Sequence, residues 1–236
     1  EIVWTSGATE SDNLALLGVV DMYAEKGRHI ITVPTEHKAI VDMAIYLESK
    51  GVEVTWLISK PDGLIDLDEL RAAIRDDTVL ISIMAANNEI GVLQPLKEIA
   101  EIANEKGVVF HTDAAQAIGK IPFDVNENGV HLASISGHKV YGPKGIGALY
   151  IRRRRPRVRL AIQMHGGGHE RGNRSGTLAV PLIVGFGKAC ELAADDLVNG
   201  EVDRIRGMRN RLYELLSSAL PETYINGSME HRLPNN

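Results

Sequence analysis

The chain has 236 residues, of which 44% are hydrophobic and 24% are charged, and this composition is typical of a globular protein with a sizeable core. Its formal net charge of −5 at pH 7 argues against a general nucleic-acid-binding protein, which is normally basic across a whole face. No segment approaches the roughly 20 apolar residues of a membrane-spanning helix.

Short apolar runs alternate with amphipathic stretches of helix length from the first residue to about Ile151, which predicts an α/β fold. The predicted strands are residues 2–5, 29–33, 53–58, 80–84, 108–111, 132–134 and 146–151. The predicted helices between them are residues 10–26, 38–50, 67–75 and 96–106. Because crossover helices cover both faces of a parallel sheet, we expect a mainly parallel seven-stranded sheet flanked by helices.

The pattern changes after Ile151, where a basic run and a glycine-rich loop precede two long predicted helices. These helices span residues 180–196 and 201–219. We predict a large domain over residues 1–180, connecting helices over 181–222 and the start of a small domain over 223–236, with a first strand at 223–225. The chain begins without methionine inside a predicted strand and stops without a closing element, so we expect it to be a fragment.

One lysine, Lys139, stands in the unusual sequence SGHKVYGPKGIG at residues 136–147, directly after a strand-like stretch. Glycines in such a segment allow the backbone to approach a ligand closely. Lys139 is therefore a candidate for a Schiff base with an aldehyde, because partial burial and cationic neighbours favour loss of its proton near neutral pH. The alternative is an ordinary surface lysine.

A carboxylate, Asp113, follows the predicted strand at residues 108–111. In open α/β sheets, ligands bind beyond the carboxyl ends of the strands. A strand-end aspartate and a later strand-end lysine are the pair that pyridoxal phosphate needs, because the carboxylate keeps the pyridine nitrogen protonated and the amine binds the aldehyde. The alternative role of Asp113 is the N-cap of a helix over residues 114–118.

Three further strand ends carry polar clusters. The turn TSGATESDN at residues 5–13 is either a phosphate site at a helix N-terminus or a helix start capped by Ser6 or Thr9. His37 is either structural or a ring that stacks on a planar cofactor and transfers protons. The sequence NNEIG at residues 87–91 either forms a turn or presents amides to a ligand.

These segments resemble the cysteine desulfurases that supply sulfur for iron–sulfur clusters and thiolated RNA, within the class V aminotransferase-like, fold-type I pyridoxal enzymes. The resemblance covers nearly the whole chain. It implies the large domain of a fold-type I transferase, a pyridoxal 5'-phosphate cofactor, L-cysteine as the substrate and a homodimer. It rests on residues 5–13, 35–39, 87–91, 111–116, 136–147 and 166–177.

The resemblance also implies a role for each matching residue. Lys139 would bind the cofactor covalently, and His37 would stack on its ring and act as an acid–base, so both are expected to be catalytic. The other predicted contacts are Ala8, Thr9, Ser136 and His138 at the phosphate, Asp113 at the ring nitrogen, Gln116 at the ring hydroxyl, Asn88 at the substrate carboxylate, and Thr177 at the phosphate of the partner subunit.

Enzymes of that family convert L-cysteine to L-alanine and carry the sulfur as an enzyme persulfide for iron–sulfur cluster assembly and tRNA thiolation. The resemblance places their catalytic cysteine beyond Asn236. The one cysteine of this chain, Cys190, lies in a predicted helix and is expected to be a structural thiol. We therefore expect the fragment alone to be inactive. A related class V lyase or aminotransferase and a non-catalytic partner-binding chain stay open as alternatives.

The basic run at residues 152–159 holds six arginines. It is a solvated rim, a nucleic-acid patch or, as the resemblance implies, a docking site for an acidic frataxin-type regulator. An iron–sulfur scaffold protein and other sulfur acceptors are further implied partners, and neither a membrane nor direct nucleic-acid binding is expected.

Two remaining signals concern metals and location. His165 and His169 flank three glycines, which are too flexible for a zinc pair, so no metal site is expected. A single cysteine excludes an internal disulfide and favours a reducing compartment, either the bacterial cytoplasm or the mitochondrial matrix.

Overall fold

The computed structural model describes residues 1–236 and is built on a seven-stranded sheet in the order β1-β7-β6-β5-β4-β2-β3. The pairs β2–β3, β2–β4, β4–β5 and β5–β6 are parallel, whereas β7 runs antiparallel to both β6 and β1. The predicted mainly parallel seven-stranded sheet is confirmed. The strands are β1 (Ile2–Thr5), β2 (His29–Thr32), β3 (Glu53–Trp56), β4 (Thr78–Ser82), β5 (Val109–Asp113), β6 (Leu132–Ser136) and β7 (Gly147–Ile151).

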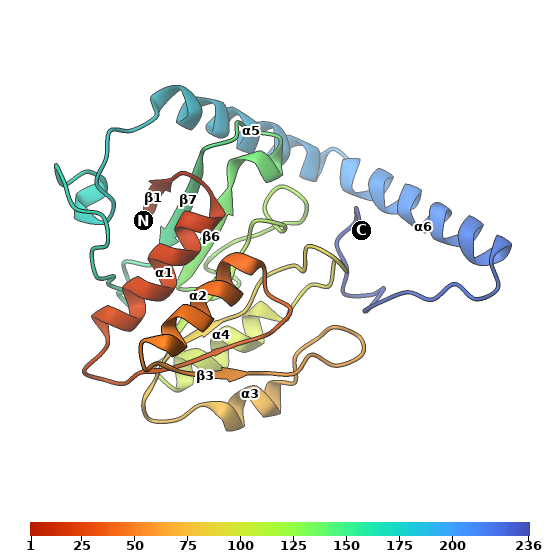
Figure 1. The fold of residues 1–236 in the computed structure, drawn as a ribbon. Coiled ribbons are helices and arrows are strands. Elements are labelled where there is room, and N and C mark those ends of the chain that lie inside the picture. Colours follow the sequence, from red (N-terminus) through yellow and green to blue (C-terminus); the bar gives the residue numbers. More distant parts are fainter.

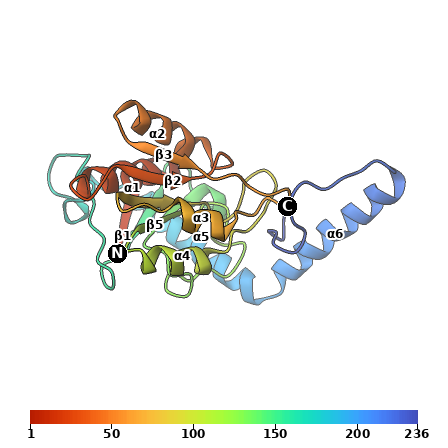
Figure 2. The ribbon, with the colours of Figure 1, turned by 90° about the horizontal axis from the view of Figure 1, so that it is seen from below.

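Helices cover both faces of the sheet, as expected. Figure 2 shows α1 and α2 on one side of the strands and α4 on the other. None of the helices is both long and apolar enough to cross a membrane. The helices are α1 (Ala8–Met22), α2 (Lys38–Ser49), α3 (Leu67–Ala73), α4 (Leu96–Glu105), α5 (Val180–Val198) and α6 (Glu201–Ala219).

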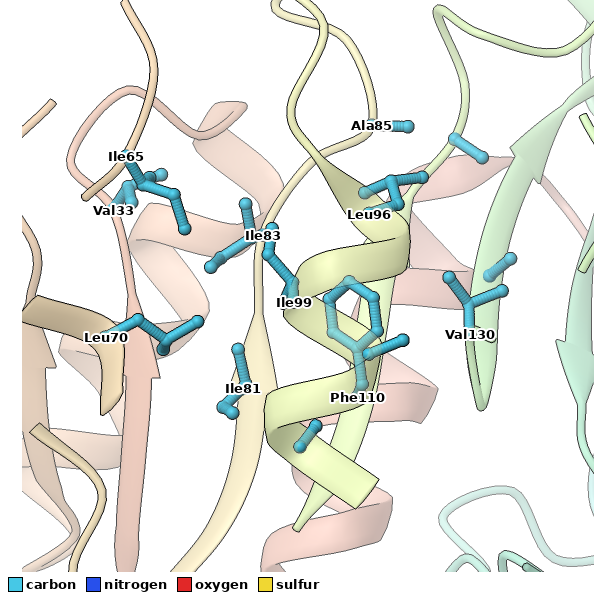
Figure 3. Close-up of a cluster of buried hydrophobic side chains, with 14 of the residues drawn as sticks. Val33, Ile65, Leu70, Ile81, Ile83, Ala85, Leu96, Ile99, Phe110 and Val130 are labelled. Carbon is cyan, nitrogen blue, oxygen red and sulfur yellow. The ribbon is translucent and has the colours of Figure 1, made fainter. Parts of the chain in front are cut away.

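Successive side chains along each strand point to opposite faces of the sheet, so the core forms two layers, one on each face. On β5, Phe110 points towards α4, whereas its neighbour Val109 belongs to the layer under α1 and α2. Figure 3 shows Phe110 and Ile81 of the sheet against Ile99 of α4. Because both faces of the parallel strands are buried, these strands read as continuous apolar runs in the sequence.

The C-terminal part departs from this layered arrangement. Helix α5 packs Phe186 against the residues that follow β6, but α6 has no buried residue and extends away from the sheet (Figure 1). The tail then returns to the loop after β4, where Val92 forms an isolated bridge with Arg232. The strand predicted at residues 223–225 is absent, because these residues have no neighbouring strand with which to pair.

Candidate active site

A cavity of about 480 Å³ lies at the carboxyl ends of β4, β5 and β6, next to the first turn of α1. This volume is typical of a small-molecule site. Thr177 is exposed and does not line this cavity. Nine predicted site residues do line it: Ala8, Thr9, His37, Asn88, Asp113, Gln116, Ser136, His138 and Lys139.

The first turn of α1 forms one end of the cavity. Gly7 is the N-cap of α1, and no side chain caps the first N–H groups of the helix, so the predicted alternative of a Ser6 or Thr9 cap is wrong. Uncapped N–H groups at a helix N-terminus favour an anion. The turn also lies close against β7, since a Cβ atom on Gly147 would be 2.6 Å from Gly7 Cα. Glycine at position 147 therefore permits this approach.

Lys139 lies in a short 3₁₀ turn, Gly137–Val140, that follows β6 directly. The turn is held by a 3.0 Å hydrogen bond between Ser136 Oγ and His138 Nδ1. Burial lowers the pKa of His138, and the nearby charges of Lys139 and Lys144 lower it further. The expected cationic neighbours are thus present, but the Lys139 side chain is exposed to the cavity rather than partly buried.

Asp113 is the last residue of β5 and is 5% exposed. Its Oδ1 atom accepts a 2.8 Å hydrogen bond from the Ala115 N–H, so Oδ2 stays free for a ligand. Burial raises the pKa of Asp113, whereas the Ala115 N–H and the charges of His37 and Lys139 act in the opposite direction without cancelling it. Residues 114–118 form turns rather than a helix, so the predicted alternative of a helix N-cap is wrong.

His37 has the structural role that was one of its two predicted alternatives, and it also lines the cavity, so its acid–base role stays a prediction. It is the N-cap of α2, and its Nδ1 atom accepts a 3.1 Å hydrogen bond from the Ala39 N–H. A neutral imidazole that accepts at Nδ1 carries its proton on Nε2, which leaves that atom able to donate.

The two asparagines after β4 have different roles, since Asn87 stabilises the turn by accepting from the N–H of Ile90. Asn88 lines the cavity.

Comparison with known proteins agrees with this geometry. The profile of the family described as "Aminotransferase class-V" matches residues 1–235. The chain belongs to the class-V aminotransferase family. Cysteine desulfurase IscS of Escherichia coli O139:H28 is 55% identical over 235 residues, which cover 100% of this chain and 57% of that protein. The chain thus spans a little over half the length of the curated relatives that it matches.

Several solved structures have the same architecture as this chain. A NifS-like protein has a TM-score of 0.93 and 41% identity, with 99% of this chain and 63% of that chain covered. DndA from Streptomyces lividans has a TM-score of 0.91 and 39% identity, with 99% and 66% covered. A structure described as SspA in complex with cysteine has 48% identity and a TM-score of 0.77 over 80% of this chain and 55% of its own.

Class-V aminotransferases depend on pyridoxal phosphate, and the residues of this cavity fit that cofactor. The uncapped N-terminus of α1 suits its phosphate, and the free Oδ2 atom of the buried Asp113 suits a protonated ring nitrogen. Lys139, which lines the cavity, would supply a primary amine for its aldehyde. The predicted fold-type I large domain and its cofactor therefore agree with both the family and the geometry.

The structure adds a contact in the class-V site that sequence reasoning missed. Lys120 Nζ donates a hydrogen bond to Gln116 Oε1. A lysine ammonium has no acceptor, so this contact determines which end of the Gln116 amide faces Lys120. The Nε2 atom, a donor, is left for the cavity. The pairing joins residues four positions apart in a turn, where the sequence carries no helical periodicity that would have revealed it.

A second missed feature is a layer of polar residues under the first turns of α1. Along the strands, residues two positions apart share a face, so Val109, His111 and Asp113 of β5 all point towards α1. His111 bonds Ser82 and Ser134 at 2.9 Å through its two ring nitrogens. This polar layer also contains Asp12 of α1 and Glu36, both buried. The spacing of Asp12 from the buried Leu16 and Val19 was a signal that it faces inwards.

A third missed feature ties the glycine-rich loop to the first turn of α1. Arg174 Nε donates to Glu10 Oε1 at 2.7 Å, and its Nη2 atom donates to Glu10 Oε2 at 3.3 Å. The Ser6 N–H donates to the same Oε2 atom at 2.7 Å. The segment that carries Thr177 is therefore fixed to the first turn of α1.

The remaining predicted signals lie outside the cavity. Cys190 is partly buried in α5, and burial raises the pKa of its thiol, which disfavours a reactive thiolate. His169 Nδ1 accepts from the Gly176 N–H at 3.2 Å, which gives this histidine a structural partner. No group of three or more His, Cys, Asp or Glu side chains is arranged to hold a metal ion.

Proposed function

We propose that this chain is the cofactor-binding core of a pyridoxal phosphate-dependent cysteine desulfurase, which converts L-cysteine to L-alanine and carries the sulfur as an enzyme persulfide. The observation that carries the proposal is the convergence of Lys139, Asp113 and His37 on one cavity. The 55% identity to a cysteine desulfurase supports the choice of L-cysteine over other amino acids.

The residues of the chain have separate tasks in this proposal. The first turn of α1, with Ala8 and Thr9, holds the phosphate together with Ser136 and His138. Asp113 would accept a hydrogen bond from the protonated ring nitrogen through Oδ2, and Gln116 would donate to the ring hydroxyl through Nε2.

Bound pyridoxal phosphate supplies an electron sink that stabilises negative charge developing on the substrate. Lys139, which lines the cavity, would anchor the cofactor and would also move protons at the substrate carbon. His37 would stack on the ring and would donate or accept a proton through Nε2. Asn88 binds the substrate carboxylate from the loop after β4.

The sulfur-accepting thiol needs a different source from Cys190. That residue lies in α5 rather than on the cavity wall, and its raised pKa leaves it as a thiol near neutral pH. We assign the persulfide-forming cysteine to the part of the relatives' length that this chain does not match, and we expect the chain alone to be inactive in desulfuration.

The proposed enzyme acts as a homodimer. The exposure of Thr177 outside its own cavity supports its assignment to the phosphate of the partner subunit.

An iron–sulfur scaffold protein and tRNA-thiolation proteins are the proposed sulfur acceptors. The exposed Arg153, Arg154, Arg157 and Arg159 support an acidic regulator of the frataxin type as a further partner. The single, partly buried cysteine supports a reducing location, the bacterial cytoplasm or mitochondrial matrix.

The test uses the full-length protein mixed with pyridoxal phosphate. Borohydride reduction followed by mass spectrometry is expected to place the label on Lys139, and a Lys139→Ala variant is expected to lose both the label and the visible absorption band. Label scattered over surface lysines in a folded protein would overturn the assignment.

The substrate is tested separately on the loaded full-length enzyme. Release of L-alanine from L-cysteine, with persulfide on the protein, is the expected result. Turnover of another amino acid in place of L-cysteine would favour a class V lyase or aminotransferase instead.

A further inference from the structure

Three carboxyl groups lie close together beneath the cavity, and they come from three different elements. Asp12 of α1 is 0% exposed, Asp113 at the end of β5 is 5% exposed and Glu36, which follows β2, is 7% exposed. The charge of Asp113 raises the pKa of both Asp12 and Glu36. Like charges so close to each other in a water-poor region cannot all persist.

The hydrogen-bond partners of the three carboxyl groups are unequal. Neither side-chain oxygen of Asp12 has a partner, and the nearest ring nitrogen, His111 Nε2, is 3.7 Å away. Glu36 accepts one hydrogen bond, from the Met84 N–H at 2.5 Å, and its Oε2 atom has no partner. Asp113 accepts from the Ala115 N–H and faces the cavity.

No cation compensates Asp12 within the polar layer. Burial lowers the pKa of His111 to about 3, so its ring is neutral near pH 7. Both of its ring nitrogens are also already paired with serine hydroxyls. By contrast, Asp113 accepts a hydrogen bond from the Ala115 N–H and lies near the charge of Lys139, and both favour its ionised form. The surroundings of Asp113 therefore favour its ionised form, whereas those of Asp12 and Glu36 do not.

An isolated buried carboxylate is so costly that the group takes up a proton instead. Burial is the largest effect and raises the pKa of Asp12 well above its usual value. The charge of Asp113 adds to this shift, whereas the nearby Ser134 hydroxyl opposes it. Burial also raises the pKa of Glu36 well above its usual value, against the single N–H of Met84.

We propose that Asp12 and Glu36 are protonated in the folded protein, so that the three-carboxyl cluster carries one negative charge, which lies on Asp113. Asp12 and Glu36 are thus positioning residues, since they surround Asp113 with neutral hydroxyl groups instead of competing anions. This assignment of charges does not depend on the cofactor. Its role, which is to direct a single negative charge at the ring nitrogen of the cofactor, rests on the proposed function.

The test compares Asp12→Asn and Glu36→Gln with Asp21→Asn, an exposed residue of the same helix α1 that serves as the matched control. Each of the first two changes replaces a neutral acid by a neutral amide of the same shape. Denaturant unfolding of the full-length protein without added cofactor is measured from pH 5 to pH 8.

The expected sign follows from the raised pKa values of the folded state. Such a group leaves stability intact below its unfolded pKa of about 4 and reduces it as the pH rises towards the folded pKa. In this window each group lowers the folding equilibrium constant of the wild type by up to about tenfold per pH unit. The ratio of the folding constants of D12N and wild type should therefore grow with pH, and likewise for E36Q, while the D21N ratio stays level.

Two results would overturn the proposal. One is a D12N or E36Q variant whose stability falls with pH as steeply as that of the wild type. The other, which needs no variant, is the absence of a protonated-carboxyl band in the infrared spectrum of the folded wild type at pH 7. If D12N fails to fold, this spectrum and E36Q decide the matter.

A cofactor readout separates this proposal from the proposed function. Loaded with pyridoxal phosphate, D12N is expected to keep the wild-type visible spectrum, whereas Asp113→Asn is expected to shift it. Failure of the wild type to bind the cofactor would contradict the proposed function alone, since the dependence of stability on pH is measured without it.

Discussion

The ion pair between Arg174 and Glu10 makes a sharp test of how the glycine-rich loop is held. In Arg174→Met the aliphatic stem is kept, but Glu10 loses both of its hydrogen bonds from the guanidinium and retains only the Ser6 N–H. The loop that ends at Thr177 then loses its polar attachment to the first turn of α1. We expect this loop to open more often while the sheet stays folded.

The size of the effect follows from burial. Both side chains are 18% exposed. Exposed ion pairs contribute about 0–1 kcal/mol, and removing one partner of a fully buried pair costs about 3–5 kcal/mol. A value of about 2 kcal/mol is therefore expected, which corresponds to roughly a 30-fold change in the opening equilibrium. The exposed pair between Lys188 and Glu191 offers a matched control, since Lys188→Met should change local opening by less than about 1 kcal/mol.

Hydrogen exchange of the backbone amides of residues 164–178 measures this opening. The effect should depend on pH, because the Arg174 and Ser6 contacts together hold the pKa of Glu10 below its usual value despite the opposing effect of burial. A lowered folded pKa contributes stability above the unfolded pKa of about 4.5, and this stability is lost as the pH falls through the folded value. The opening equilibria of this loop in wild type and in Arg174→Met should therefore become equal in acid. Equal exchange at neutral pH, or a difference that persists undiminished in acid, would refute the reasoning.

Three further predictions concern the cavity, the core and the basic run. Lys120→Met should weaken binding of pyridoxal phosphate by about fivefold, because Gln116 loses its fixed orientation and about 1 kcal/mol of hydrogen bonding, while Lys120→Arg should bind nearly normally. Fluorescence titration measures this, and equal affinities of the Met variant and wild type would contradict it. Phe110→Ala, at a fully buried ring, should reduce the free energy of unfolding by about 3–5 kcal/mol in denaturant titrations, and a loss below about 1 kcal/mol would be inconsistent with the core described above. Reversing Arg157 and Arg159 to glutamate should abolish binding of an acidic partner in a pull-down while cofactor binding persists; unchanged partner binding would exclude the basic run as the docking site.

The sequence predicted the architecture well because periodicity and the ends of strands leave local signals. The strand at Ile2–Thr5 and the helix at Glu201–Ala219 agree with their predictions at both ends. The lysine, the aspartate and the histidine of the cavity were readable because each lies at or shortly after the end of a strand, and strand ends meet at one edge of a parallel sheet.

The missed features depend on contacts between distant segments, which no local pattern encodes. Glu10 and Arg174 meet only through folding of the loop, and Asp12 meets Glu36 only across the sheet edge. The prediction of a strand at residues 223–225 was wrong for the opposite reason. These residues have adequate strand propensity, but no partner strand is available to them.

The antiparallel pairing of β1 with β7 has a consequence for how the protein is made. Thr5, next to the anion-binding turn, pairs with Gly147, so the two walls of the cavity are brought together by one of the longest sequence separations in the sheet. On the ribosome, β1 cannot form this pair until β7 has emerged, and such long-range pairing is slow to form. The cofactor can therefore stabilise the nascent chain only after synthesis has passed the end of β7.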